Sequence, residues 1–155
     1  MKTNTALFFV FMVASATLFF VSCKKDRNCN ETNNSAAGES ESHNFGMNCM
    51  NCHTAGGKGE GCFNAAGSVS DSLLTSHLSS GTVKFYTQPD GAGQLKYTIP
   101  IDEKGNFFTT ESISVNGLYP AITGPYGTTN YMSSSLTNSS CNSCHGVTTL
   151  KLWGK

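Results

Sequence analysis

Residues 81–108 read GTVKFYTQPDGAGQLKYTIPIDEKGNFF, and their apolar positions repeat with a period of two. Val83 and Phe85 alternate with polar neighbours, and the same alternation runs through 95–101 after a PDGAG turn at 89–93. This pattern predicts two antiparallel strands joined by a turn. Pro100 interrupts the second of these strands, and a proline without an N–H is tolerated at the edge of a sheet.

Outward from this hairpin, turn signals recur about every ten residues. A DEKGN turn at 102–106 precedes a strand at 107–108, and further short strands are predicted at 63–70, 113–115 and 119–123. The expected fold is therefore mainly β, a small antiparallel β-sandwich at about 63–132. Helix is expected only as short turns at the two cysteine motifs described below, and a short helix at 70–78 is compatible with the pattern.

The composition limits both the core and the partners. The chain has 155 residues, a formal net charge of +0 and a pI near 6.9, which suits one domain and excludes a basic nucleic-acid-binding surface. Five of the ten Phe lie in the first twenty residues, and the rest of the chain is rich in Gly, Ser, Thr and Asn. A core this small calls for disulfides, a metal or a covalent cofactor, and seven cysteines are present.

The N-terminus has the features of an export signal. Residues 6–21 are apolar and uncharged, too short a run for a membrane-spanning helix, and they predict a signal peptide over 1–22. The run ends in Phe-Val-Ser-Cys, which resembles a bacterial lipobox with Cys23 as the lipid-modified first residue of the mature protein. An uncleaved anchor helix, or conventional cleavage elsewhere, are the alternatives. Residues 23–42 hold no Val, Ile, Leu or aromatic residue after Cys23, and predict a lipid-anchored flexible tether.

Two motifs carry the chemistry, CMNCH at 49–53 and CNSCH at 141–145. Both are C-x-x-C-H, the attachment site of c-type haem, in which two thiols add to the haem vinyl groups and the histidine binds the iron. The sequence thus predicts two covalently bound haem c groups in a domain over 43–155. The thioether residues would be Cys49, Cys52, Cys141 and Cys144, and the iron ligands would be His53 and His145.

Three other uses of these cysteines fit the sequence less well. Zinc would not require the adjacent histidines, and the two pairs lie 88 residues apart in the sequence. A thioredoxin-like pair needs a βαβ setting that the pattern lacks. Four structural disulfide cysteines would leave both histidines unexplained.

The remaining axial ligands have to come from His or Met. His43 lies in a polar, Gly-containing phrase six residues before Cys49, and Met132 lies nine residues before Cys141. These two are the preferred candidates, which would make one bis-His and one His/Met haem. His77, Met47 and Met50 are weaker candidates, because an isolated His is usually solvated and Met50 lies inside its own C-x-x-C loop.

The order of these segments resembles a family of secreted bacterial dihaem and multihaem cytochromes. There, two C-x-x-C-H motifs bracket a sandwich like the carboxypeptidase regulatory-like domain. The segments that carry the resemblance are HNFGMNCMNCHTAGG at 43–57, AAGSVSDS at 65–72, GTVKFYTQPDGAG at 81–93, IDEKGNFFTTESI at 101–113, GLYPAITGPYGTTNYM at 117–132 and CNSCHG at 141–146. The resemblance implies electron transfer in the cell envelope, with His43 and Met132 at ligand positions and His77 in a variable loop.

Two cysteines remain, Cys29 and Cys62. In an oxidising compartment they would most simply form a disulfide, with two free thiols or a bridge between chains as alternatives.

The predicted function is electron transfer by a dihaem lipoprotein without catalytic residues. It would be anchored to a membrane of the cell envelope by its N-terminal lipid, on the periplasmic side or the outer-membrane surface. It would exchange electrons with redox partner proteins. The rival functions are a small dihaem peroxidase or reductase, which needs an open iron position, and a subunit of a multihaem conduit or filament, which would be oligomeric.

Overall fold

The computed structural model describes residues 29–155. The predicted signal peptide over 1–22 and the predicted lipid site at Cys23 lie outside the described residues. Within residues 29–155, none of the helices has the length and apolar character needed to cross a membrane.

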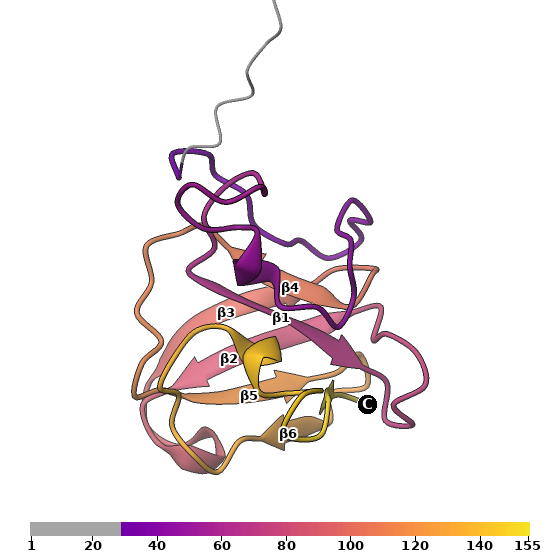
Figure 1. The fold of residues 1–155 in the computed structure, drawn as a ribbon. Helices are drawn as coiled ribbons and strands as arrows, with labels where there is room; N and C mark the ends of the chain where they lie inside the picture. The colour runs from indigo at the N-terminus through magenta and orange to yellow at the C-terminus, as the bar shows by residue number, and fades with distance from the viewer. Residues whose placement is uncertain (1–28) are drawn as a thin grey trace, which may run out of the picture.

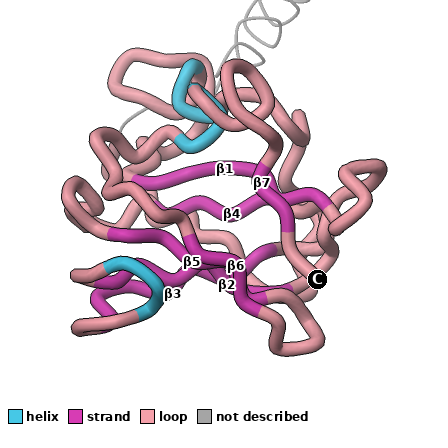
Figure 2. The backbone as a smooth tube through the Cα atoms, turned by 90° about the horizontal axis from the view of Figure 1, so that it is seen from below, coloured by secondary structure: helices cyan, strands magenta, loops and turns pink. Residues whose placement is uncertain are grey.

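The described chain folds into two packed β-sheets, which Figure 2 shows as separate layers. One sheet has the order β4-β1-β7 and the other β3-β2-β5-β6. The pairings are antiparallel except for β1 with β7, which is parallel. The strands are β1 (Ala65–Ser70), β2 (Gly81–Tyr86), β3 (Leu95–Ile101), β4 (Asn106–Thr109), β5 (Tyr119–Thr123), β6 (Thr129–Tyr131) and β7 (Leu152–Trp153). The prediction of a mainly β sandwich is confirmed.

The alternation of apolar residues explains how the two sheets pack. In β2, Val83 and Phe85 are buried while their neighbours are partly exposed, and Ile99 and Ile101 of β3 point to the same core. Phe107 of β4 closes the core from the other sheet. Pro100 belongs to β3, which is an edge strand as its proline predicted.

Some sequence predictions of secondary structure were wrong. Residues 113–115 form a loop, although Val115 is buried and Ile113 packs against the core, because apolar burial alone does not require strand pairing. Residues 70–78 form turns with an isolated bridge from Ser70 to His77, and the Asp71 side chain accepts the Thr75 and Ser76 N–H groups that a helix would use. The pattern also missed β7, which extends the sandwich beyond residue 132.

The predicted flexible tether is the largest correction. Residues 33–35 lie along β4 and exchange hydrogen bonds with it: Ser35 N donates to Phe108 O at 2.9 Å, and Thr110 N donates to Asn33 O at 3.2 Å. Ser35 is buried, and its hydroxyl donates to Pro100 O at 2.7 Å. The segment is therefore part of the folded domain through hydrogen bonds to an edge, which its polar composition does not prevent.

Helix is confined to 3-10 turns in the described residues. The turn η3 (Pro89–Gly91) lies in the predicted β2–β3 connection, and η2 (Cys49–Asn51) and η4 (Cys141–Ser143) are the two cysteine motifs themselves. Figure 1 shows η2 and η4, in purple and yellow, on the same side of the sandwich close to β1. The fold thus carries both motifs to one strand, as the sequence alone did not indicate.

Candidate haem sites

The first motif is a single turn held by its own backbone. Cys52 N and His53 N both donate to Cys49 O, at 3.1 and 3.0 Å. Asn48 caps the turn, since its side-chain oxygen accepts from Met50 N at 3.1 Å. These hydrogen bonds hold the two cysteines and the histidine together on one turn.

The His53 ring is fixed in position and in tautomer. Its Nδ1 lies 2.8 Å from Glu60 O, and a carbonyl oxygen only accepts, so Nδ1 carries the proton and Nε2 keeps its lone pair. The ring is buried and stacks on Phe63 with a centroid separation of 4.0 Å. Gly59 allows the loop to close over the ring, since an added Cβ there would lie 2.6 Å from His53 Nδ1.

His43 lies beside this ring. The centroids of His43 and His53 are 5.8 Å apart with planes inclined at 34°. Two metal–nitrogen bonds of about 2 Å place two imidazole centroids about 6 Å apart when they ligate one ion from opposite sides. The residues at this site therefore fit a bis-His iron, and they place His43 with its neighbouring motif.

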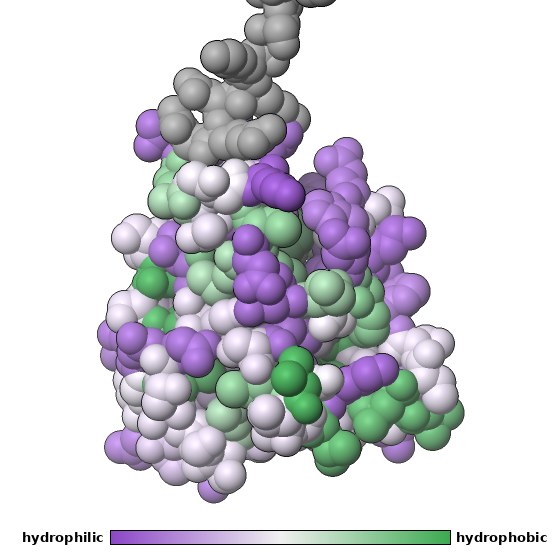
Figure 3. Space-filling model, in the orientation of Figure 1, coloured by the Kyte–Doolittle hydropathy of each residue, from purple (hydrophilic) through white to green (hydrophobic). Residues whose placement is uncertain are grey.

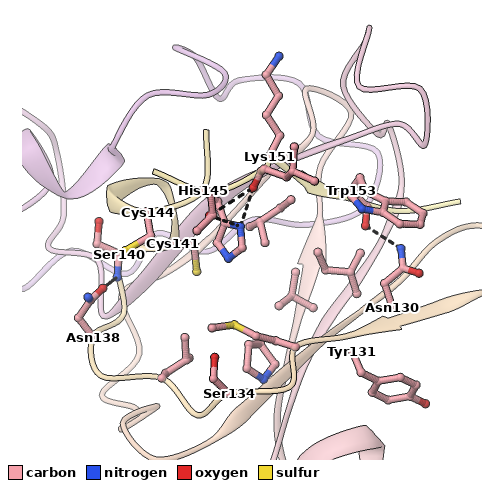
Figure 4. Close-up of a pocket in the computed structure, with 18 of the residues that line it drawn as sticks. Asn130, Tyr131, Ser134, Asn138, Ser140, Cys141, Cys144, His145, Lys151 and Trp153 are labelled. Carbon is pink, nitrogen blue, oxygen red and sulfur yellow. Dashed lines mark hydrogen bonds between the residues drawn. The ribbon is translucent and has the colours of Figure 1, made fainter. Parts of the chain in front are cut away.

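The second motif repeats the geometry of the first. Cys144 N and His145 N donate to Cys141 O at 3.2 and 2.9 Å, and His145 Nδ1 lies 2.8 Å from Leu150 O. As in the first motif, the carbonyl oxygen leaves the proton on Nδ1 and the lone pair on Nε2. Figure 4 shows the His145 ring pointing into a cavity, with Cys141 and Cys144 beside it and Tyr131 and Trp153 across from it.

The cavity has a volume of about 750 Å³, within the range of about 300–1,000 Å³ for cofactor sites. Its wall comes from β2, β4, β5 and β6 and from the C-terminal segment. The apolar residues that line it include Val83, Phe107, Pro120, Ile122, Leu136, Leu152 and Met132. The structure thus brings Met132 to the same cavity as His145, and an apolar cofactor of haem size fits there.

The rim of this cavity is partly apolar. Val147 and Leu150 are each 73% exposed on the loop that follows His145, and Trp153 is partly exposed beside the cavity. Figure 3 shows apolar surface in the lower right of the view, where Figure 1 places both the C-terminal end and the loop between β1 and β2.

The first cysteine of each motif lies in an environment that disfavours charge. Burial raises the pKa of the Cys141 thiol to about 12, with a smaller contribution from the nearby Cys49 thiol, and burial likewise raises the pKa of Cys49. Cys141 packs against β1 at Gly67, where an added Cβ would lie 2.9 Å from the Cys141 Cβ. Cys52 and Cys144, in contrast, are exposed.

The two motifs lie side by side although 87 residues separate them in sequence. Ser140 Oγ donates to Asn48 Oδ1 at 2.6 Å, and Ser139 Oγ lies 3.8 Å from Met50 Sδ. Residues directly before the second motif therefore contact the turn of the first.

This proximity removes the sequence separation as an argument against zinc. In residues 29–155, no group of three or more His, Cys, Asp or Glu side chains is arranged to hold a metal ion. A structural zinc site needs four such ligands, whereas a haem iron takes its equatorial ligands from the porphyrin and needs one or two from the protein. The four motif cysteines are free thiols in the structure, and no disulfide joins them.

Cys29 and Cys62 form a disulfide with a Cα–Cα separation of 4.7 Å. This is the intrachain bridge, one of the alternatives that the sequence leaves open. It joins the start of the described chain to the loop that carries Glu60, whose carbonyl oxygen lies against His53.

The weaker ligand candidates are placed elsewhere. His77 packs edge-on against Phe45 with a centroid separation of 5.9 Å, and it is not among the residues that line the cavity. Met47 is exposed, and Met50 faces Ser139.

Sequence reasoning missed the residues that support the histidines. Phe63 stacks on the His53 ring, and Glu60 and Leu150 contribute backbone oxygens. Every residue has a backbone oxygen, so the residue type gives no indication of this role. Asn142, inside the second C-x-x-C loop, is buried and hydrogen bonded to β1; a polar residue there carries no distinguishing signal in one sequence.

Comparison with known proteins adds no relative to this description. No protein-family model matches the chain, and neither does any curated protein or any solved structure.

Proposed function

We propose that this protein is a dihaem c-type cytochrome lipoprotein that transfers electrons in the bacterial cell envelope. The observation that carries the proposal is the matched geometry of the two C-x-x-C-H turns. In both, the histidine donates its Nδ1 proton to a backbone carbonyl oxygen at 2.8 Å and keeps Nε2 for a metal. Two chance motifs would have no reason to share this arrangement.

The residues divide between two sites. Cys49 and Cys52 would form the thioethers of the first site, with His53 and His43 as axial ligands. Cys141 and Cys144 would form those of the second, with His145 and Met132. When bound, haem c supplies one-electron iron chemistry whose potential depends on axial ligands, burial and hydrogen bonds.

The two sites differ in ways that would separate their potentials. Met132 offers a thioether, which raises a haem potential relative to imidazole, and the apolar cavity disfavours the more highly charged oxidised state. His43 is exposed, and the first site offers two imidazoles where the second offers an imidazole and a thioether. We therefore assign the lower potential to the first site and the higher potential to the second.

The contact between the motifs supports electron exchange within the protein. Asn48 and Ser140 are hydrogen bonded, so the attachment turns of both sites are neighbours. The polypeptide in this proposal holds two redox groups close together and has no catalytic residue. Lipid at Cys23 would keep it on a membrane of the envelope, where redox partner proteins reach it.

A peroxidase or reductase is the second candidate, because the exposure of His43 suits a ligand that leaves its iron. Binding of cyanide or carbon monoxide to the native protein, with loss of His43 ligation, would favour it. Unchanged spectra at both haems in the presence of either ligand would favour a protein that only transfers electrons.

The number of haems bound by the native chain tests the main proposal. The full-length chain expressed with its leader in a host that matures c-type cytochromes is expected to carry two haems per chain. A pyridine haemochrome assay and the intact mass measure this number. One haem, or bound zinc without haem, would contradict the proposal.

Replacing Met132 by Ala tests the second axial ligand. The loss of the thioether is expected to lower the potential of one haem and to convert its ferric spectrum from six-coordinate low spin, while the other haem stays unchanged. Met47→Ala is the matched control, because Met47 is exposed and distant in sequence from the cavity residues. A Met132→Ala spectrum identical to wild type at both haems would remove Met132 from the ligand set.

A further inference from the structure

Three buried polar side chains connect the two candidate sites. Ser68 of β1, Asn106 of β4 and Asn142 of η4 are only 3%, 2% and 6% exposed. Ser68 and Asn106 face each other in the β1–β4 pairing, and Asn142 belongs to the second C-x-x-C loop. We call these three residues the Ser68 cluster.

One arm of the cluster reaches the second site. The Asn142 side-chain oxygen accepts from Ser68 N at 2.8 Å, and its amide nitrogen lies 3.4 Å from His145 O. A side chain within the motif is thereby attached to β1 at one end and to the backbone of the proposed iron ligand at the other.

The other arm reaches the first site. Ser68 Oγ accepts from Gly46 N at 2.9 Å and donates to Asn106 Oδ1 at 2.7 Å. The Asn106 amide nitrogen donates to Ser42 Oγ at 2.8 Å and lies 3.4 Å from His43 O. The chain before and after His43 is thus hydrogen bonded to the sandwich.

The cluster is complete as a hydrogen-bond network. The buried Asp102 carboxylate accepts from Asn106 N at 3.0 Å and from Lys104 N at 2.9 Å, which fixes the start of β4. In the described part of the chain, no buried side-chain nitrogen or oxygen lacks a hydrogen-bond partner. A satisfied buried network holds its members in one arrangement, because any displacement leaves a polar group unpaired.

We propose, building on the proposed function, that the Ser68 cluster is a positioning device for both haem sites. Asn142 orients the segment of His145, and Asn106 with the Ser68 hydroxyl orients the segment of His43. Ser68 joins both arms, so β1 helps to set the spacing of the two sites, together with the direct hydrogen bond between Ser140 and Asn48.

The test compares Ser68→Ala and Asn142→Leu in the holoprotein. Ser68→Ala is expected to speed hydrogen exchange at the Gly46 amide about tenfold, and Asn142→Leu to do the same at the amide of residue 68. In the ferric EPR spectrum, Ser68→Ala should shift the signal of the bis-His haem. Asn142→Leu should shift that of the other haem, with the haem count still two in both variants.

Ser35→Ala is the matched control. Ser35 is as buried as Ser68, and its hydroxyl takes part in three hydrogen bonds, with Pro100 O, Phe108 O and Phe108 N. None of these belongs to the motif segments, so both haem signals should stay as in wild type although the protein is destabilised. The two test variants remove different arms, so if one fails to fold the other still decides.

The outcomes are separable. Wild-type chain with fewer than two haems contradicts the proposed function, and with it this inference. Two haems in the wild type, together with Ser68→Ala and Asn142→Leu signals that match those of Ser35→Ala, would leave the function standing and overturn the positioning role. Shifts confined to the assigned haem in each variant would support it.

Discussion

Replacing Cys141 and Cys144 by Ala is expected to remove one of two haems and to lower the melting temperature by roughly 10–20 °C, for a loss of about 3–5 kcal/mol. The reason is the cavity of about 750 Å³ beside these cysteines. Without the proposed haem, the apolar wall of this cavity would lose its packing partner. Circular dichroism melting and the intact mass, recorded on the same preparation, measure both effects.

The same change in the first motif provides the comparison. Cys49→Ala with Cys52→Ala should also leave one haem, but with a smaller loss of melting temperature, because His43 at this site is exposed, whereas the second site has the apolar cavity. Equal melting temperatures for the two double variants would show that the cavity does not hold a haem. Removal of both haems should leave the domain poorly folded, since its own core is small.

Replacing Cys29 and Cys62 by Ser is expected to lower the free energy of unfolding by about 3–4 kcal/mol, as the chain-entropy model gives for a bridge of this span. The disulfide closes a loop with a sequence separation of 33 residues, and it anchors the segment at 33–35 that lies on β4. Urea unfolding of the oxidised holoprotein, monitored by fluorescence, gives the value.

Two comparisons make this measurement specific. Cys29→Ala with Cys62→Ala should lower the free energy of unfolding by the same amount. Agreement of the two double variants would show that the effect comes from loss of the bridge and not from the polarity of serine. Amide exchange at Ser35 should be faster in both variants, while the haem count stays at two. An unchanged unfolding midpoint would mean that hydrogen bonds to β4 alone hold the N-terminal segment.

The sequence was most informative where one local rule decides the structure. The alternation around Val83 and Phe85 placed β2, and Pro100 placed β3 at an edge, because side-chain period and a missing N–H act within a few residues. The C-x-x-C-H turns were also readable, since their chemistry requires a fixed spacing.

What the sequence did not reveal depends on distant partners. The segment at 33–35 looked like a tether because it has no apolar residue, yet Ser35 pairs with Phe108, 73 residues later. The contact of Asn48 with Ser140 spans 92 residues, and the sequence around either residue does not predict it. The same holds for Asn142, whose role depends on an N–H of β1.

The ordered start of the domain changes how far the protein can reach from a membrane. With the disulfide at Cys29, only five residues, 24–28, separate the domain from Cys23, and the six extended steps from Cys23 to Cys29 cover about 20 Å. The 20-residue tether expected from composition would have covered about 70 Å. If Cys23 carries lipid as proposed, the proposed first haem site would lie near the headgroups, and we expect its redox partners to be membrane proteins or to bind at that surface.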